Sequence, residues 1–139
     1  MDRVARPVVV ALGSNLGSRE SHLHYAIDRL GRVLASLRVS PLAETAPVGT
    51  PDLQAPYLNA VAIGDSDRPA RDLLDTLLAI ERERGRERPY RYAPRTLDLD
   101  LILCGDDVVN EPALVVPHPR FRERSFVLEP LAALAPQLR

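Results

Sequence analysis

Two aspartates, Asp98 and Asp100, stand two positions apart in the alternating run from Leu97 to Leu103. On a strand, residues i and i+2 share one face and lie ~6.5–7 Å apart, so both carboxylates project away from the leucines. Carboxylates that close repel each other unless a cation lies between them. Mg²⁺ binds one or two carboxylates and completes its shell with water and phosphate oxygens. The spacing therefore predicts a site for two Mg²⁺ ions that assist phosphoryl transfer.

The charge around this pair favours a bound polyphosphate. Residues 81–95 contain six arginines and three glutamates, whereas residues 96–112 contain five acidic residues and no basic one. Guanidinium groups bind phosphate oxygens in pairs, so a cationic segment beside a dianionic strand is typical of a polyphosphate site. Two other interpretations stay open on these residues alone: ordinary aspartates on a solvated strand face, and a helix end stabilised by Glu–Arg pairs.

Other candidate residues give weaker signals. The glycine-containing segment 13–17 lies between a strand and a helix and could bind phosphate, although a tight turn explains its glycines equally well. His118 lies between two prolines and could reach a phosphate oxygen. Tyr57 and Phe126 could stack on a flat heterocycle, and Asn59, on the strand face of Tyr57, could hydrogen-bond to its edge. Plain core packing is the alternative for both rings.

Composition limits the classes of function. All 18 basic side chains are arginine, which excludes mechanisms that need a lysine amine, such as Schiff-base formation. The net charge of −1 and the few aromatic residues in the basic segment argue against a nucleic-acid partner. Cys104 is the single cysteine, which excludes a disulfide framework and predicts core packing. No apolar run reaches the ~18 residues of a membrane helix and no signal region is present, so we expect a soluble, cytoplasmic protein.

Apolar patterns predict the elements that position these residues within one domain, residues 1–139. Strands are expected at 8–12, 37–40, 57–63 and 97–103. One helix is expected from Ser18, its N-cap, to Leu34, and a second starts within 65–69 and is interrupted at Gly85. This order predicts an α+β, ferredoxin-like βαββαβ fold, an antiparallel sheet with both helices on one face. Loops are expected at 45–56 and 86–95, and a C-terminal extension adds a short hairpin, with extended pieces at 108–109 and 114–116, and a helix near 125–134.

Four segments recur together in one order and spacing: Ala11–Gly17, Tyr57–Ala60, Pro94–Asp100 and Val116–His118. In this respect the chain closely resembles the 6-hydroxymethyl-7,8-dihydropterin pyrophosphokinases of folate biosynthesis, over roughly Val8 to Pro136. The segment around Arg95 is highly specific, whereas the glycine turn alone is not. The resemblance implies a monomeric enzyme that transfers the terminal pyrophosphoryl group of ATP to the pterin hydroxymethyl oxygen, by attack on the β-phosphorus, and releases AMP.

The resemblance also implies a role for each candidate residue. Asp98 and Asp100 would bind two Mg²⁺ ions, and Arg86 and Arg95 would grip the phosphates and stabilise developing charge. Residues of the ATP site would be Glu81, Arg86, Arg95, Leu101, His118 and Arg124. Those of the pterin site would be Thr45, Val48, Tyr57, Asn59 and Phe126, with the two aromatic rings enclosing the pterin. No nucleic-acid or membrane partner is implied.

Two rival hypotheses belong to other functional classes. The first is a non-catalytic ferredoxin-like module that binds a small ligand and uses the two aspartates only as surface charge. ATP binding that does not depend on Mg²⁺, measured by calorimetry, would favour it over the kinase. The second, RNA binding through the arginine-rich loop, is weaker because only Tyr90 and Tyr92 could stack on bases there.

Overall fold

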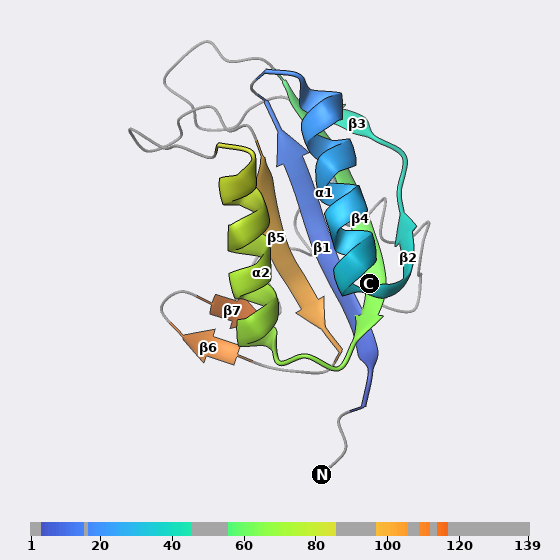
Figure 1. Ribbon diagram of the computed structural model, residues 1–139, viewed down its shortest axis with the longest axis vertical. Coiled ribbons are helices and arrows are strands. Elements are labelled where there is room, and N and C mark those ends of the chain that lie inside the picture. Colours follow the sequence, from blue (N-terminus) through green and yellow to red (C-terminus); the bar gives the residue numbers. More distant parts are fainter. Residues whose placement is uncertain are drawn as a thin grey trace.

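A computed structural model describes residues 4–15, 17–45, 56–85, 97–105, 109–111 and 114–116. Its elements are β1 (Arg6–Ser14), α1 (Arg19–Val33), β2 (Ala35–Val39), β3 (Ala43–Thr45), β4 (Tyr57–Ser66), α2 (Ala70–Glu83), β5 (Asp98–Cys104), β6 (Val109–Glu111) and β7 (Leu114–Val116). Both helices lie over one face of the main sheet (Figure 1). Within the described ranges, no helix is long and apolar enough to cross a membrane.

The main sheet has five strands in the order β2-β4-β1-β5, with β3 also pairing to β4, and each of its pairings is antiparallel. The α+β class, the antiparallel sheet and the one-sided helices expected from the sequence are confirmed, and the strand order is consistent with the ferredoxin-like arrangement. Strands β6 and β7 pair separately as a hairpin, near the expected extended pieces. The helix expected near 125–134 lies outside the described residues.

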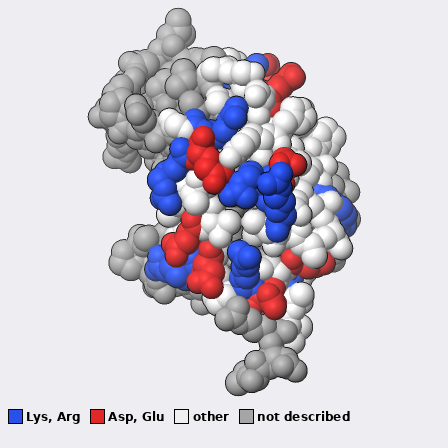
Figure 2. Space-filling model, in the orientation of Figure 1, with Lys and Arg blue, Asp and Glu red and all other residues white. Residues whose placement is uncertain are grey.

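The exposed side of the helices carries charges of both signs. Figure 2 shows basic and acidic side chains interleaved over this face rather than gathered into one patch. One such pair joins Arg32 to Asp28 one turn earlier in α1, at 3.1 Å, and another joins Arg29 of α1 to Glu83 of α2, at 2.8 Å. Exposed pairs of this kind contribute little to stability, but a pair between two helices also constrains their relative position.

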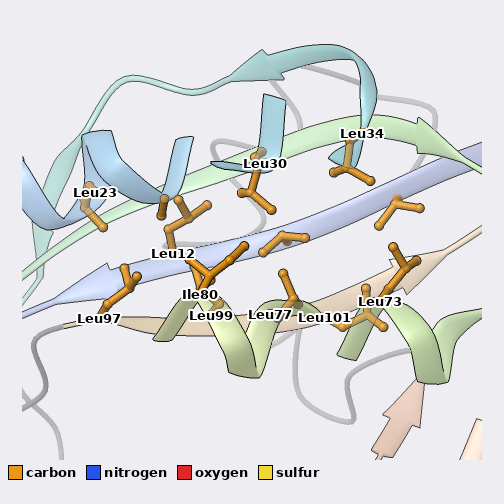
Figure 3. Close-up of a cluster of buried hydrophobic side chains, with 14 of the residues drawn as sticks. Leu12, Leu23, Leu30, Leu34, Leu73, Leu77, Ile80, Leu97, Leu99 and Leu101 are labelled. Atoms are coloured by element: carbon orange, nitrogen blue, oxygen red, sulfur yellow. The ribbon is translucent and has the colours of Figure 1, made fainter. Parts of the chain in front are cut away.

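The core lies between the helices and the sheet. Alternate residues of β1 and β5 point toward the helices, where they meet one apolar stripe from each helix (Figure 3). The stripes recur at helical spacing, as the sequence predicts: Leu23, Ala26 and Leu30 in α1 and Leu73, Leu77 and Ile80 in α2 are all buried. Cys104 is buried in the same cluster, which confirms the expected packing role.

Two strands are longer than the apolar runs predicted. Gly13 and Ser14, expected in a turn, continue β1 because they pair with Asn59 and Leu58 of β4. At the other end of the same ladder Ser66, expected at the start of a helix, pairs with Arg6. The second helix therefore begins later than predicted, at Ala70. In each case the hydrogen bonds of a neighbouring strand extend the β-structure beyond the local pattern.

The start of α1 and the end of α2 agree with the prediction in position, but the N-cap differs in one detail. Ser18 occupies the N-cap position of α1, but its hydroxyl makes no capping hydrogen bond. Helix α2 ends just before Gly85, whose φ of 70° lies in the left-handed region that favours glycine. The end of α2 therefore has a defined position, immediately before the arginine-rich segment in the sequence.

Candidate functional site

Asp98 and Asp100 share one face of β5, as the alternation predicts. Both are half-buried, whereas the residues between and beside them, Leu97, Leu99 and Leu101, are buried in the core. Figure 3 shows these three leucines directed toward the helix side of the sheet. The two carboxylates consequently lie on the opposite face, away from both helices.

The neighbouring strand offers only small residues beside these carboxylates. In the β1–β5 register, Gly13 lies opposite Asp98 and Ala11 lies opposite Asp100. Bulky side chains at these two positions would project into the space next to the carboxylates, because directly opposite residues are only ~4.5–5.5 Å apart. The small residues of β1 therefore add no bulky side chain to that space.

Gly13 also lies opposite Asn59 of β4, so Asn59, Gly13 and Asp98 form one row across three strands. Adjacent strands are ~4.8 Å apart, which puts the two polar residues ~10 Å from each other on either side of the glycine. A Cβ atom at position 13 would lie 3.2 Å from Asn59 Oδ1 and 3.4 Å from Tyr57 Cδ1. The Asn59 amide and the Tyr57 ring therefore lie close to the backbone of β1 at Gly13.

Substituting Gly13 tests whether this close approach matters. We expect Gly13→Ala to leave the fold intact and to raise the KM for a pterin substrate about tenfold, because Asn59 and Tyr57 must shift by a few tenths of an ångström. Gly31→Ala in α1 is the matched control, since a Cβ there would make an ordinary 3.8 Å contact with Leu37 Cδ2. Steady-state kinetics at saturating ATP measure the effect; equal KM values for both variants would contradict the assignment.

Glu81 fixes the strand that carries the two aspartates. It is 2% exposed on α2, and its Oε2 accepts a hydrogen bond of 2.7 Å from the backbone N–H of Leu99, the residue between Asp98 and Asp100. Because its acceptor is a carboxylate, this buried hydrogen bond is a strong one, and it fixes the position of β5 relative to α2. Glu81 was predicted as an ATP contact; the structure gives it this backbone partner. Leu101, also predicted there, has its side chain in the core, so it can offer ATP only its main chain.

The predicted pterin residues Thr45, Tyr57 and Asn59 come together where β3 joins β4. Thr45 pairs with Tyr57 in register, and Ala43 pairs with Asn59. The Asn59 Nδ2 donates to the carbonyl oxygens of Ala43 and Tyr57 at 3.5 and 3.4 Å, which are long hydrogen bonds. These two bonds connect the side-chain amide to the backbones of β3 and β4.

Arg19, at the start of α1, ties the two borders of segment 46–55. Its Nη1 donates to the carbonyl oxygen of Pro56 at 2.8 Å, and its Nη2 donates to Glu44 Oε1 at 2.7 Å. Both borders lie next to predicted pterin residues, Glu44 before Thr45 and Pro56 before Tyr57. One guanidinium thus keeps the two ends of that segment together.

Six predicted site residues lie outside the described residues: Val48, Arg86, Arg95, His118, Arg124 and Phe126. Within the described ranges, no group of three or more His, Cys, Asp or Glu side chains comes together. Asp98 and Asp100 remain a pair of carboxylates on one strand face, and such a pair suits Mg²⁺ with water and phosphate oxygens. The roles of Gly13, Ala11 and Arg19 were not predicted, and only the register of the strands reveals the first two.

Comparison with known proteins identifies the family. The profile of the 7,8-dihydro-6-hydroxymethylpterin-pyrophosphokinase family matches residues 9–136. The chain belongs to this family. It is similar to the 2-amino-4-hydroxy-6-hydroxymethyldihydropteridine pyrophosphokinase of Pseudomonas aeruginosa, with 46% identity over 134 residues, which cover 95% of the chain and 82% of that enzyme.

Two further pyrophosphokinases of the same printed name are similar over most of their length. The protein of Bacillus subtilis is 45% identical over 132 residues, covering 93% of the chain and 78% of that protein. The protein of Haemophilus influenzae is 37% identical over 131 residues, covering 93% of the chain and 81% of that protein. The family resemblance noted in the sequence is thereby confirmed, and every described element from β1 to β7 falls within the matched part, apart from the first residues of β1.

Proposed function

We propose that this chain catalyses the transfer of the pyrophosphoryl group of ATP to the hydroxymethyl oxygen of 6-hydroxymethyl-7,8-dihydropterin, a step of folate biosynthesis. Membership of the pyrophosphokinase family supports the reaction class. The observation that carries the assignment of the site is the row Asn59–Gly13–Asp98, in which the Asn59 amide and the Asp98 carboxylate lie on one sheet face. We also assign the ferredoxin-like topology, extended by the β6–β7 hairpin and a helix near 125–134.

The pterin is assigned to the side of the row formed by β3 and β4. A flat heterocycle can stack on the Tyr57 ring while the Asn59 amide forms hydrogen bonds to its polar edge. Val48 and Thr45 supply further contacts, and Phe126 covers the second face of the ring. Because Gly13 carries no side chain, the hydroxymethyl group can extend across β1 toward Asp98.

ATP is assigned to the other side of the row, beside β5. Asp98 and Asp100 would hold two Mg²⁺ ions, which when bound neutralise phosphate charge and polarise the β-phosphorus. Arg86, Arg95 and His118 bind phosphate oxygens, and Arg124 and the main chain at Leu101 line the nucleotide site. Glu81 keeps β5 in place through Leu99.

The reaction is a displacement at the β-phosphorus. A bond forms between this phosphorus and the hydroxymethyl oxygen, the bond from the phosphorus to the oxygen of the α-phosphate breaks, and the hydroxyl proton passes to solvent. AMP leaves with the electron pair of the broken bond. Guanidinium groups such as those of Arg86 and Arg95 suit the stabilisation of the charge that develops on the phosphoryl oxygens, because they bind such oxygens in pairs.

Product analysis tests the proposal. With ATP, Mg²⁺ and 6-hydroxymethyl-7,8-dihydropterin, we expect one equivalent of AMP for each equivalent of pyrophosphorylated pterin. A chelator should stop the reaction and added Mg²⁺ should restore it. Formation of ADP as the sole nucleotide product, or turnover that continues in the chelator, would contradict the proposal.

A further inference from the structure

Polar side chains of α1 hold the last residue of α2. The carboxylate of Glu83 accepts hydrogen bonds from Arg29 Nε at 2.8 Å, from Arg29 Nη2 at 2.9 Å and from the Tyr25 hydroxyl at 2.5 Å. The two bonds from Arg29 form a bidentate pair, the arrangement that fixes the orientation of a carboxylate most firmly. Both donors come from α1, which lies over the same sheet face as α2 (Figure 1).

The next residue, Arg84, is held by α1 as well. Its Nε donates to His22 Nδ1 at 2.9 Å, and its Nη2 donates to Ser21 Oγ at 3.2 Å. Its guanidinium also lies over the ring of Tyr25, 4.7 Å from the ring centre, a cation–π contact. Two consecutive residues at the end of α2 are thus fixed by four residues of α1. We call this set of six residues the helix clamp.

The helix clamp sits immediately before the segment that carries the proposed phosphate-binding arginines. Gly85 turns the chain with a φ of 70°, and Arg86 follows it. Only Gly85 separates Arg84 from Arg86 in the sequence. Any change in the position of Arg84 therefore changes the point at which the chain leaves α2, immediately before Arg86.

We propose that the helix clamp is a positioning device for pyrophosphoryl transfer, in which His22 holds Arg84 and thereby sets the position of Arg86 against ATP. This inference rests on the proposed function. None of the clamp residues is assigned to substrate or metal, and Asp98 and Asp100 lie on the opposite face of the sheet. In this proposal, their effect on the reaction passes through Arg86.

The clamp requires a neutral His22. Its Nδ1 accepts the hydrogen bond from Arg84, so the ring proton sits on Nε2, and protonation of Nδ1 would remove the acceptor and place two cations together. The pKa of His22 lies below its ordinary value of 6.5, mainly because burial disfavours the charged ring and also because the Arg84 cation repels it. From the turn before α1, the described neighbour on the Nε2 side is Gly17, which cannot titrate.

The other clamp residues keep their charge between pH 5.5 and 8. Hydrogen bonds from Arg29 and then Tyr25 lower the pKa of Glu83 from 4.5 to about 2, so this carboxylate stays ionised. The bond to Glu83 raises the pKa of Tyr25 above 10, so this hydroxyl stays protonated. His22 is therefore the clamp residue that titrates. Because its folded pKa is lowered, the unfolded chain binds more protons below pH 6.5, and both folding and the clamp weaken as pH falls.

Three variants test the proposal against activity and stability together. We expect His22→Ala to lower kcat/KM for ATP about tenfold at pH 7.5 and to leave the KM for the pterin within twofold. His22→Asn retains an acceptor at the position of Nδ1 and cannot titrate, so it should stay near wild-type activity at pH 7.5 and decline less than the wild type down to pH 5.5. His24→Asn, on the exposed side of the same helix, is the matched control and should follow the wild type at every pH.

The outcomes separate this proposal from the proposed function. If the wild type releases AMP while His22→Ala lowers the melting temperature without changing kcat/KM for ATP, the clamp is only structural and the proposal is overturned. A parallel rise in KM for both substrates would overturn it too. If His22→Ala does not fold, Arg84→Gln at the half-exposed helix end replaces it, with the same expected tenfold loss. A wild type that releases no AMP would overturn the proposed function and this inference with it.

Discussion

Asp98→Ala is expected to lower kcat/KM for ATP by ~10³-fold or more while the fold survives. A metal ion in a phosphoryl-transfer site contributes several kcal/mol of charge stabilisation, and each ~1.4 kcal/mol corresponds to a factor of ten in rate. Asp98 is half-buried on the face away from the core, so its loss removes no core packing. AMP release under saturating Mg²⁺ measures the activity, and circular dichroism measures the fold.

Two further variants make this test specific for the charge. Asp98→Asn keeps the size of the side chain and should lose as much activity as Asp98→Ala, because an amide is a poor substitute for a carboxylate on Mg²⁺. Asp75→Asn changes an exposed aspartate of α2 by the same chemistry and should keep wild-type activity. Wild-type rates in both Asp98 variants would end the assignment of this carboxylate to the metal.

Leu30→Ala should have the largest effect on stability, a loss of ~3–5 kcal/mol in the free energy of unfolding. Leu30 is 1% exposed in the middle of the core, and it also lines a small apolar hollow between the two helices together with Leu34 and Leu73. Removing its side chain would enlarge that hollow, because α1 is held to α2 by the helix clamp and cannot move inward to fill it. Urea unfolding followed by circular dichroism gives the free energy.

Ile27→Ala is the control for this prediction. Ile27 lies on the same helix, half-buried at the edge of the core. Truncating it therefore removes less buried apolar surface than Leu30→Ala does, and it leaves no enclosed space. We expect a loss of ~1 kcal/mol. Similar losses in the two variants would mean that Leu30 is surrounded by structure that rearranges easily.

Local periodicity was sufficient for most of the fold. The alternation from Leu97 to Leu103 predicted both a strand and the shared face of its aspartates, and the spacing of Leu23 and Leu30 predicted α1 and its buried stripe. These features depend on neighbours within a few residues, so a single sequence contains them. The family resemblance added the reaction and the roles of residues, which no periodicity provides.

Features that depend on distant partners were not predicted. Strand β3 has only three residues and exists because it pairs with β4. Gly13 was expected in a turn, but it pairs with both Asn59 and Asp98 and lies between them in the row across three strands. His22 and Arg84 lie 62 positions apart, and their bond depends on how closely the two helices approach each other on the sheet. The predicted roles of Arg86, Arg95 and His118 stay predictions.

The guanidinium of Arg19 has a consequence for how this site can change in evolution. Because it joins Glu44 to Pro56, the distance between the two borders of residues 46–55 is set outside that stretch. For a flexible connection with fixed ends, doubling the length costs only ~0.6 kcal/mol of closure entropy. Insertions, deletions or wholesale exchange of those ten residues should therefore be tolerated without displacing Tyr57. The sequence of this segment can therefore diverge while the sheet stays the same.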